Sequence, residues 1–223
     1  MLGDDPAGAG ALFAQAFAAF EQACDAQGAL LAAAGAAECI VFVGKSHAPL
    51  DPWLAAIERY ADGYLATRDA DIEALVLPAM LAAFAHRQPG HRLTMVLADR
   101  AARLLDDPRF TSNLSMLASL AYVFTMRGEV PRFDAFRERL DALRTKQDSP
   151  VALARWYGAS LFFRAVLGDR AGARAEAAEA VRFLETFPDN PLKARVLLRA
   201  AHAASYGDGD TVLATRLLDQ TRP

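Results

Sequence analysis

The spacing of glycine residues along the chain constrains its fold more than any other feature. Three similar short turns contain Gly128, Gly168 and Gly207, which are 40 and 39 residues apart. Gly44 lies 84 residues before Gly128, which is two steps of 42, and the intermediate turn is then Gln88-Pro89-Gly90. Glycine permits the positive φ that ends many helices. The spacing therefore predicts helices that end at regular intervals.

Prolines form a second series between these glycines. Pro108, Pro150 and Pro188 are 42 and 38 residues apart, and each lies roughly midway between two glycine turns. Proline is suited to the first position of a helix, and Asp107 before Pro108 can cap one. Two interleaved series with a period near 40 predict a repeated helix–turn–helix unit.

The segments between these breakers have the hydrophobic periodicity of helices. One apolar face is predicted in residues 92–104, where it consists of Leu93, Leu97, Ala101 and Leu104. In residues 170–185, the prediction is a polar stripe opposite an alanine-rich face. That stripe consists of Glu176, Glu179 and Arg182, and the opposite face of Ala171, Ala175, Ala178 and Val181.

The alternate segments are apolar on more than one face, as expected for helices packed on both sides. They are residues 29–43, 111–126 and 151–167. The sequence therefore predicts an all-α fold, a right-handed α-solenoid of about five helix–turn–helix units and about eleven helices in a single domain over residues 1–223. The first helix, near residues 9–26, has no inner helix before it. We therefore expect a piece of a longer array, or ends covered by another domain or by a second copy in a homodimer.

Composition restricts the class of protein further. Hydrophobic residues make up 53% of the chain and charged residues 23%, with a net charge of −3, so the chain lacks the basic excess of a nucleic-acid-binding module. Cys24 and Cys39 are expected to be buried free thiols in a cytoplasmic protein. The apolar stretch from Gly28 to Val43 is interrupted by Glu38 and is shorter than the roughly 20 residues of a membrane span. It is expected to be a buried helix.

Motifs for catalysis or cofactor binding are incomplete in this sequence. Gly44-Lys45-Ser46 resembles the end of a phosphate-binding loop, but Cys39 stands where that motif needs its first glycine. His86 and His91 lie on either side of a turn and do not have the spacing of metal ligands on one helix. We therefore expect no metal, no cofactor and no enzymatic activity, although residues distant in the sequence could still converge.

Basic residues lie on or at the ends of the expected inner helices. In helical solenoids these helices line a concave groove that binds ligands. The predicted binding residues are Lys45, Arg87, Arg127, Arg155, Arg164 and Arg199. Arginine binds carboxylates through two bonds, so the expected ligand is an acidic protein or peptide, or a small anionic effector. The helix dipole alone would also account for Lys45, Arg87 and Arg127.

Several segments, taken in order, resemble helical-repeat regions of large bacterial transcriptional regulators, the MalT-like and LuxR-type proteins with tetratricopeptide-like arrays. The segments are residues 30–32, 40–42, 49–53, 87–89 and 122–129, and they extend over nearly the whole chain. The units are longer than the 34 residues of a tetratricopeptide repeat, and its Trp-x-x-Leu-Gly start is absent. The resemblance implies a segment that receives a signal, with the DNA-binding and nucleotide-binding parts elsewhere.

Three functional hypotheses follow. The first is a non-catalytic protein-interaction or signal-sensing array of a bacterial regulator. The second is a free-standing adaptor or chaperone-like protein that holds a peptide. The third is an enzyme whose site is built from several helices, which would require an enclosed pocket with clustered titratable side chains.

Overall fold

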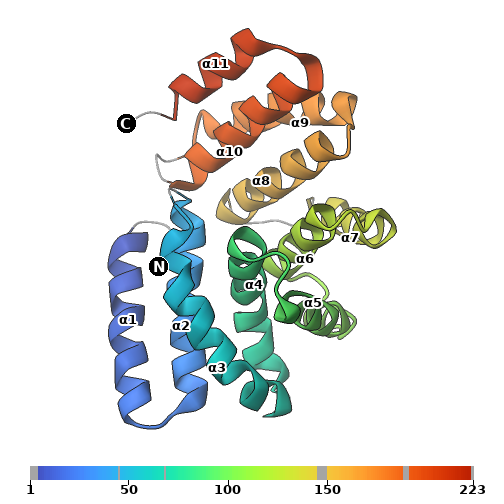
Figure 1. Ribbon diagram of the computed structural model, residues 1–223. Coiled ribbons are helices and arrows are strands. Elements are labelled where there is room, and N and C mark those ends of the chain that lie inside the picture. The colour runs from blue at the N-terminus through green and yellow to red at the C-terminus, as the bar shows by residue number, and fades with distance from the viewer. Residues whose placement is uncertain (1–4, 45, 68, 145–149, 188–190, 222–223) are drawn as a thin grey trace. The chain divides into compact units, whose positions relative to one another are not determined.

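The computed structural model describes residues 5–44, 46–67, 69–144, 150–187 and 191–221. This part of the chain contains eleven α-helices and no β-strand, which confirms the all-α prediction and the expected number of helices (Figure 1). The chain divides into two compact units, Met1–Arg127 and Gly128–Pro223, which we call unit 1 and unit 2.

Unit 1 contains six α-helices and one short 3-10 helix, Ala48–Leu50. The α-helices are α1 (Pro6–Gln22), α2 (Ala26–Val43), α3 (Asp51–Thr67), α4 (Ala70–Arg87), α5 (Arg92–Leu104) and α6 (Leu114–Met126). Helix α2 packs on α4 and α4 on α6, while α3 and α5 each pack on the helices before and after them. Alternate helices thus contact one another in unit 1, and two of them, α2 and α6, cover segments predicted to be apolar on more than one face.

Helices α1 and α2 lie side by side as an antiparallel hairpin (Figure 1). They approach closely because α2 has glycine where α1 has phenylalanine: Phe20 lies against Gly28 and Phe13 against Gly35, with no room for a Cβ atom. The helix expected near residues 9–26 spans Pro6–Gln22 and pairs with the helix that follows it.

Helix α2 is the one helix of the described residues that is long and apolar enough to cross a membrane by length and composition. Of its residues, 61% are buried within the structure. Its burial against α1, α3 and α4 fits the expected core helix.

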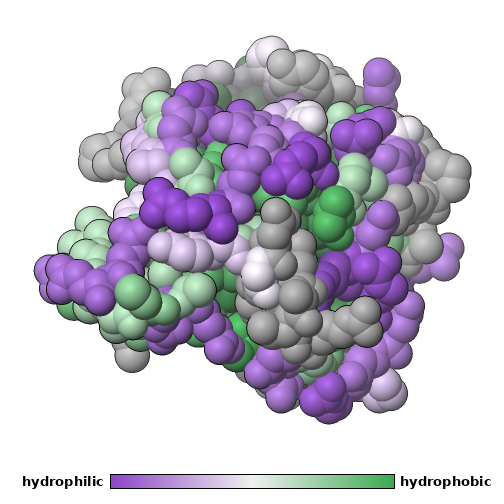
Figure 2. All heavy atoms as spheres, turned by 60° about the horizontal axis from the view of Figure 1, so that its bottom comes forward, coloured by the Kyte–Doolittle hydropathy of each residue, from purple (hydrophilic) through white to green (hydrophobic). Residues whose placement is uncertain are grey.

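Figure 2 shows one face of the molecule, on which hydrophilic side chains predominate and apolar ones lie between them.

The described residues of unit 2 form five α-helices and a short π-helix, Ala203–Asp208. The α-helices are α7 (Val130–Leu143), α8 (Pro150–Val166), α9 (Arg170–Leu184), α10 (Pro191–His202) and α11 (Thr211–Asp219). Helix α8 packs on α7, α9 and α10, and α10 also packs on α11. Trp156 of α8 is buried, and its Nε1–H donates to the carbonyl oxygen of Leu140 at 2.7 Å.

The apolar stripe predicted for residues 92–104 is confirmed, because Leu93, Leu97, Ala101 and Leu104 of α5 are all buried. The stripe predicted for residues 170–185 is wrong. Glu176 is buried in α9, together with Ala173, Ala177, Ala180 and Leu184, whereas Ala171, Ala175 and Ala178 are exposed. Alanine is compatible with either environment, so its pattern did not indicate which face of this helix is buried.

The glycine turns are largely as expected. Gly44, Gly128 and Gly168 have φ of 68°, 70° and 75°. Gly207 is not a turn glycine, because it lies within the π-helix; Gly209 instead has the left-handed conformation, with φ of 68°. Pro188 lies outside the described residues.

The start predicted at Asp107-Pro108 is also wrong. Residues 105–112 form turns, and α6 begins at Leu114, capped by Asn113. Asp107 instead accepts hydrogen bonds from Arg109, including one from its backbone N–H at 3.0 Å, which stabilise the turn.

Candidate binding face on helices α8 and α10

Helices α8 and α10 lie against each other in unit 2. A glycine faces a valine at one point of this contact, and an arginine guanidinium lies beside an aromatic ring at another. A Cβ atom added to Gly158 of α8 would lie 3.8 Å from Val196 of α10. Near the end of α8, the guanidinium carbon of Arg199 lies 4.3 Å from the ring centroid of Phe162. This cation–π contact holds the charge of Arg199 beside α8.

The two helices carry positive charge only. Residues 150–166 and 191–202 contain no aspartate or glutamate, and their basic residues are Arg155, Arg164, Lys193, Arg195 and Arg199. The corresponding central helices of unit 1 differ, because α2 and α4 carry Glu38, Asp71 and Glu73. This contrast marks α8 and α10 as the candidate site for a negatively charged ligand.

Helical spacing gathers part of this charge on one side of each helix. Residues three and four positions apart share a helix face. The face of α8 consists of Arg155, Ala159, Phe162 and Val166, and that of α10 of Arg195, Leu198, Arg199 and His202. We call these eight residues the α8–α10 face.

The α8–α10 face also exposes apolar side chains. Val166 is 48% exposed and Leu198 is 51% exposed. Cations beside exposed aliphatic groups can bind a chain that alternates carboxylates with apolar side chains, because each type of group then has a partner.

The electrostatic environment of His202 is consistent with a concentration of positive charge. Partial burial lowers the pKa of His202 below its ordinary value, and the nearby charge of Arg199 lowers it further. The imidazole is therefore held in its neutral form near pH 7, where it can donate or accept a hydrogen bond.

Arg164 does not belong to this face. It is nine residues from Arg155, or two and a half helical turns, and so lies on the opposite side of α8. Its guanidinium donates from Nε to Glu176 at 2.8 Å and from Nη1 to Asp169 at 2.6 Å, and Nη2 lies 3.4 Å from Asp141. Arg164 therefore holds α8 to α7 and α9 through three carboxylates.

Glu176 is the most buried member of this cluster, with a side chain that is 5% exposed. Its Oε2 accepts hydrogen bonds from Ser160 and Arg164, and its Oε1 is buried without a hydrogen-bond partner. Burial raises the pKa of Glu176, whereas Ser160 and Arg164 act in the opposite direction. The backbone N–H of Gly172, followed by Arg164, lowers the pKa of Asp169.

The two predicted residues of unit 1 that the structure describes, Arg87 and Arg127, differ in their surroundings. Arg87 forms a bidentate pair with Asp51 at 2.7 Å for both bonds, and this pairing lowers the pKa of Asp51. Arg127 is exposed at the end of α6, immediately before Gly128. Lys45 lies outside the described residues.

Of the six predicted cations, unit 2 thus brings Arg155 and Arg199 to the faces of adjoining helices and uses Arg164 elsewhere. Our reading of the sequence missed Arg195, Leu198 and His202. The signal was present, because these residues follow helical spacing around Arg199 and no acidic residue interrupts them.

Candidate metal ligands do not cluster in the part of the chain that the structure describes, where no three histidine, cysteine, aspartate or glutamate side chains could hold an ion. Comparison of the chain with models of known families, with curated proteins and with solved structures gave no match.

Proposed function

We propose that this chain is a non-catalytic helical-repeat module that binds an acidic, leucine-containing segment of a partner protein on the α8–α10 face. The observation that carries the proposal is that two adjoining helices contain no acidic residue and that their defined face carries three cations, Arg155, Arg195 and Arg199. Exposed Val166 and Leu198 supply the apolar part of the recognition surface.

We also propose that the helix pairs form a right-handed α-solenoid of the tetratricopeptide-like kind. Contacts between consecutive helix pairs recur at similar separations in sequence, which supports a repeat. In unit 1, Tyr60 bonds Glu21 across 39 residues, Asn113 bonds Ala74 across 39, and Ser119 bonds Pro78 across 41. The same array, in the cytoplasm of a bacterium, would serve as the signal-receiving part of a regulator of the type that the sequence resembles.

A binding experiment with charge-reversed variants tests the proposal. The probe is a fluorescein-labelled synthetic peptide in which leucines separate pairs of glutamates, titrated with the full chain and followed by fluorescence anisotropy. Arg199→Glu is expected to weaken binding by about tenfold or more, because a charge-assisted hydrogen bond contributes roughly 1.5–3 kcal/mol. Arg199→Gln, which is milder for the fold, should weaken it in the same direction.

Arg182→Glu is the matched control. Arg182 is exposed on α9, and its reversal changes the net charge of the protein equally without altering the α8–α10 face. The proposal is wrong if Arg182→Glu weakens binding as much as Arg199→Glu, or if the wild type does not bind the peptide.

A small anionic effector is the alternative occupant of the same face. In that case citrate or phosphate at millimolar concentration would displace the peptide completely at constant ionic strength, and a peptide with alanine in place of leucine would bind equally well. Binding that depends on the leucines instead supports the protein segment, since only that ligand uses Val166 and Leu198.

A further inference from the structure

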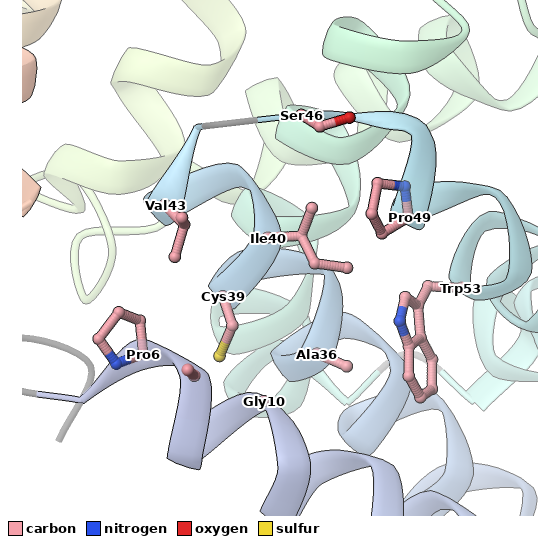
Figure 3. Close-up of a pocket in the computed structure, with 10 residues that line it drawn as sticks. Pro6, Gly10, Ala36, Cys39, Ile40, Val43, Ser46, Pro49 and Trp53 are labelled. Atoms are coloured by element: carbon pink, nitrogen blue, oxygen red, sulfur yellow. The ribbon is translucent and has the colours of Figure 1, made fainter.

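A pocket lies in unit 1, between the first turns of α1, the last turns of α2 and the start of α3 (Figure 3). Its volume is about 360 Å³, which is at the lower end of the roughly 300–1,000 Å³ of pockets that bind small molecules. Small residues create the space, because Ala7 and Gly10 of α1 face Ala36 of α2 where larger side chains would fill it.

The described lining contains no charged side chain. Most of its surface is hydrocarbon, and the walls are made by Pro6, Ile40, Val43, Pro49 and Trp53. A charged ligand would lose its hydration there without gaining a counter-ion from the described lining, and such a loss is costly. The pocket therefore favours a neutral, largely apolar occupant.

Three polar groups border this apolar space, and they differ in availability. The Ser46 hydroxyl accepts a hydrogen bond from the backbone N–H of Ala48 at 3.3 Å. Burial raises the pKa of the Cys39 thiol to about 11, so this group stays protonated. The indole nitrogen of Trp53 lies on the side of the ring toward the pocket (Figure 3), and the structure gives its N–H no acceptor among the described residues.

We propose that this pocket binds a small neutral molecule that combines one aromatic ring or short hydrocarbon chain with a single hydrogen-bond acceptor. The apolar part of the ligand occupies the space beside Gly10 and Ala36. Its acceptor atom accepts a hydrogen bond from the indole N–H of Trp53. This pocket belongs to unit 1 and the α8–α10 face to unit 2, and the two proposals stand or fall independently.

The two tryptophans of the chain provide a direct readout with an internal control. Nuclear magnetic resonance of the 15N-labelled protein gives one indole N–H signal for Trp53 and one for Trp156. Acetophenone, a ring with one carbonyl, is titrated as the probe. The Trp53 signal is expected to shift saturably, while the Trp156 signal, whose N–H is bonded to Leu140, stays in place.

Two chemical analogues test the ligand class. Benzoate has a similar shape but carries a charge, and we expect it to bind at least about tenfold more weakly because the pocket would desolvate the carboxylate. Ethylbenzene lacks the acceptor, so it should bind without the large downfield shift of the Trp53 N–H proton that a hydrogen bond produces.

A blocking variant tests the location. Gly10→Leu places a side chain in the pocket, and a Cβ atom at this position meets only Cys39, at an ordinary 3.6 Å. Acetophenone should no longer shift the Trp53 signal in this variant. Gly63→Leu is the matched control, because it makes the same change in α3 where a Cβ atom meets nothing within 4 Å. If Gly10→Leu does not fold, Ala7→Leu blocks the same pocket.

The proposal is overturned by any of three results. These are a Trp53 signal that does not shift saturably with acetophenone, a shift that persists in folded Gly10→Leu or Ala7→Leu, and benzoate binding as tight as acetophenone binding. Loss of the shift in the blocking variant with retention in Gly63→Leu supports it.

Discussion

The side-chain amide nitrogen of Asn113 lies 3.2 Å from the carbonyl oxygen of Ala74 and donates a hydrogen bond to it. Ala74 needs this donor because Pro78, four residues later in α4, has no N–H to complete the helical bond. The Oδ1 of Asn113 meanwhile caps α6 by accepting from Met116 N–H at 3.0 Å. One side chain thus compensates the proline in α4 and begins α6.

Asn113→Asp separates these two roles, because a carboxylate still caps α6 but cannot donate to Ala74. We expect the free energy of unfolding to fall by about 1–3 kcal/mol, the cost of leaving a part-buried carbonyl unsatisfied and next to a negative charge. Urea denaturation followed by circular dichroism measures it. In a Pro78→Ala background the helix provides its own donor, so the same substitution should cost at least about 1 kcal/mol less. Equal costs in both backgrounds would contradict this role of Asn113.

This relationship shows what the sequence could not provide. The sequence predicts alternating helices because breaker spacing and apolar periodicity are local properties. The local pattern predicts the start of α6 near Pro108. The residue that caps α6 is instead Asn113, which also donates a hydrogen bond to a carbonyl 39 residues earlier in the chain. Helix boundaries that depend on such distant contacts cannot be predicted from local sequence patterns.

Arg164 is expected to stabilise unit 2 rather than bind a ligand. Arg164→Leu leaves the carboxylate of Glu176 buried without its cation, and we expect the free energy of unfolding to fall by about 3–5 kcal/mol at pH 7. Glu176→Gln in the same background should restore a large part of this loss. Thermal and urea denaturation of the two variants test the pair, and equal stability of Arg164→Leu and wild type would exclude it.

The pH dependence of Arg164→Leu provides an independent check. Burial already raises the pKa of Glu176 in the wild type, and removing Arg164 raises it further. A raised pKa in the folded state means that the contribution to stability is complete below the ordinary glutamate pKa and lost as pH rises through the folded value. The variant should therefore regain stability relative to wild type as the pH falls from 7 toward 5. A constant difference across this range would contradict the assignment.

Gly209 and Gly207 should respond differently to alanine. Gly209 has a left-handed backbone, so Gly209→Ala is expected to lower the free energy of unfolding by about 1–2 kcal/mol. Gly207 lies within the π-helix, so Gly207→Ala should be neutral or mildly stabilising. Chemical denaturation of both variants decides between the two turns, and the reverse order of stabilities would favour Gly207 as the turn residue.

The two cysteines are expected to differ in reactivity toward a thiol reagent. The expectation that both thiols are buried is wrong for Cys24, which is exposed. Cys39 is 3% exposed, and burial raises the pKa of its thiol from 9.0 to about 11. This shift alone lowers the thiolate fraction by about 100-fold, and thiolate is the reactive form. Ellman's reagent at pH 8 should therefore modify one thiol rapidly and the second slowly, and both rapidly in guanidinium chloride. Two fast thiols in the native protein would show that Cys39 is accessible.

The candidate binding face could be predicted only in part. Two of its three cations, Arg155 and Arg199, were recognisable because they lie on or near segments that the sequence predicts to be inner helices. Arg164 was misassigned because charge type alone does not reveal which side of a helix a residue occupies, and Glu176 was hidden among alanines that fit either face. The pocket beside Trp53 left no motif, since it arises where small residues of α1 and α2 meet near the start of α3.

Reversing the sign of the charges on both the protein and its peptide ligand tests the central claim most directly. The double variant Arg195→Glu, Arg199→Glu should lose affinity for the glutamate–leucine peptide and gain affinity for a peptide with lysine in place of each glutamate, measured by anisotropy at the same salt concentration. The wild type should show the opposite preference. If the double variant keeps the preference of the wild type, the α8–α10 face is not where this protein binds its partner.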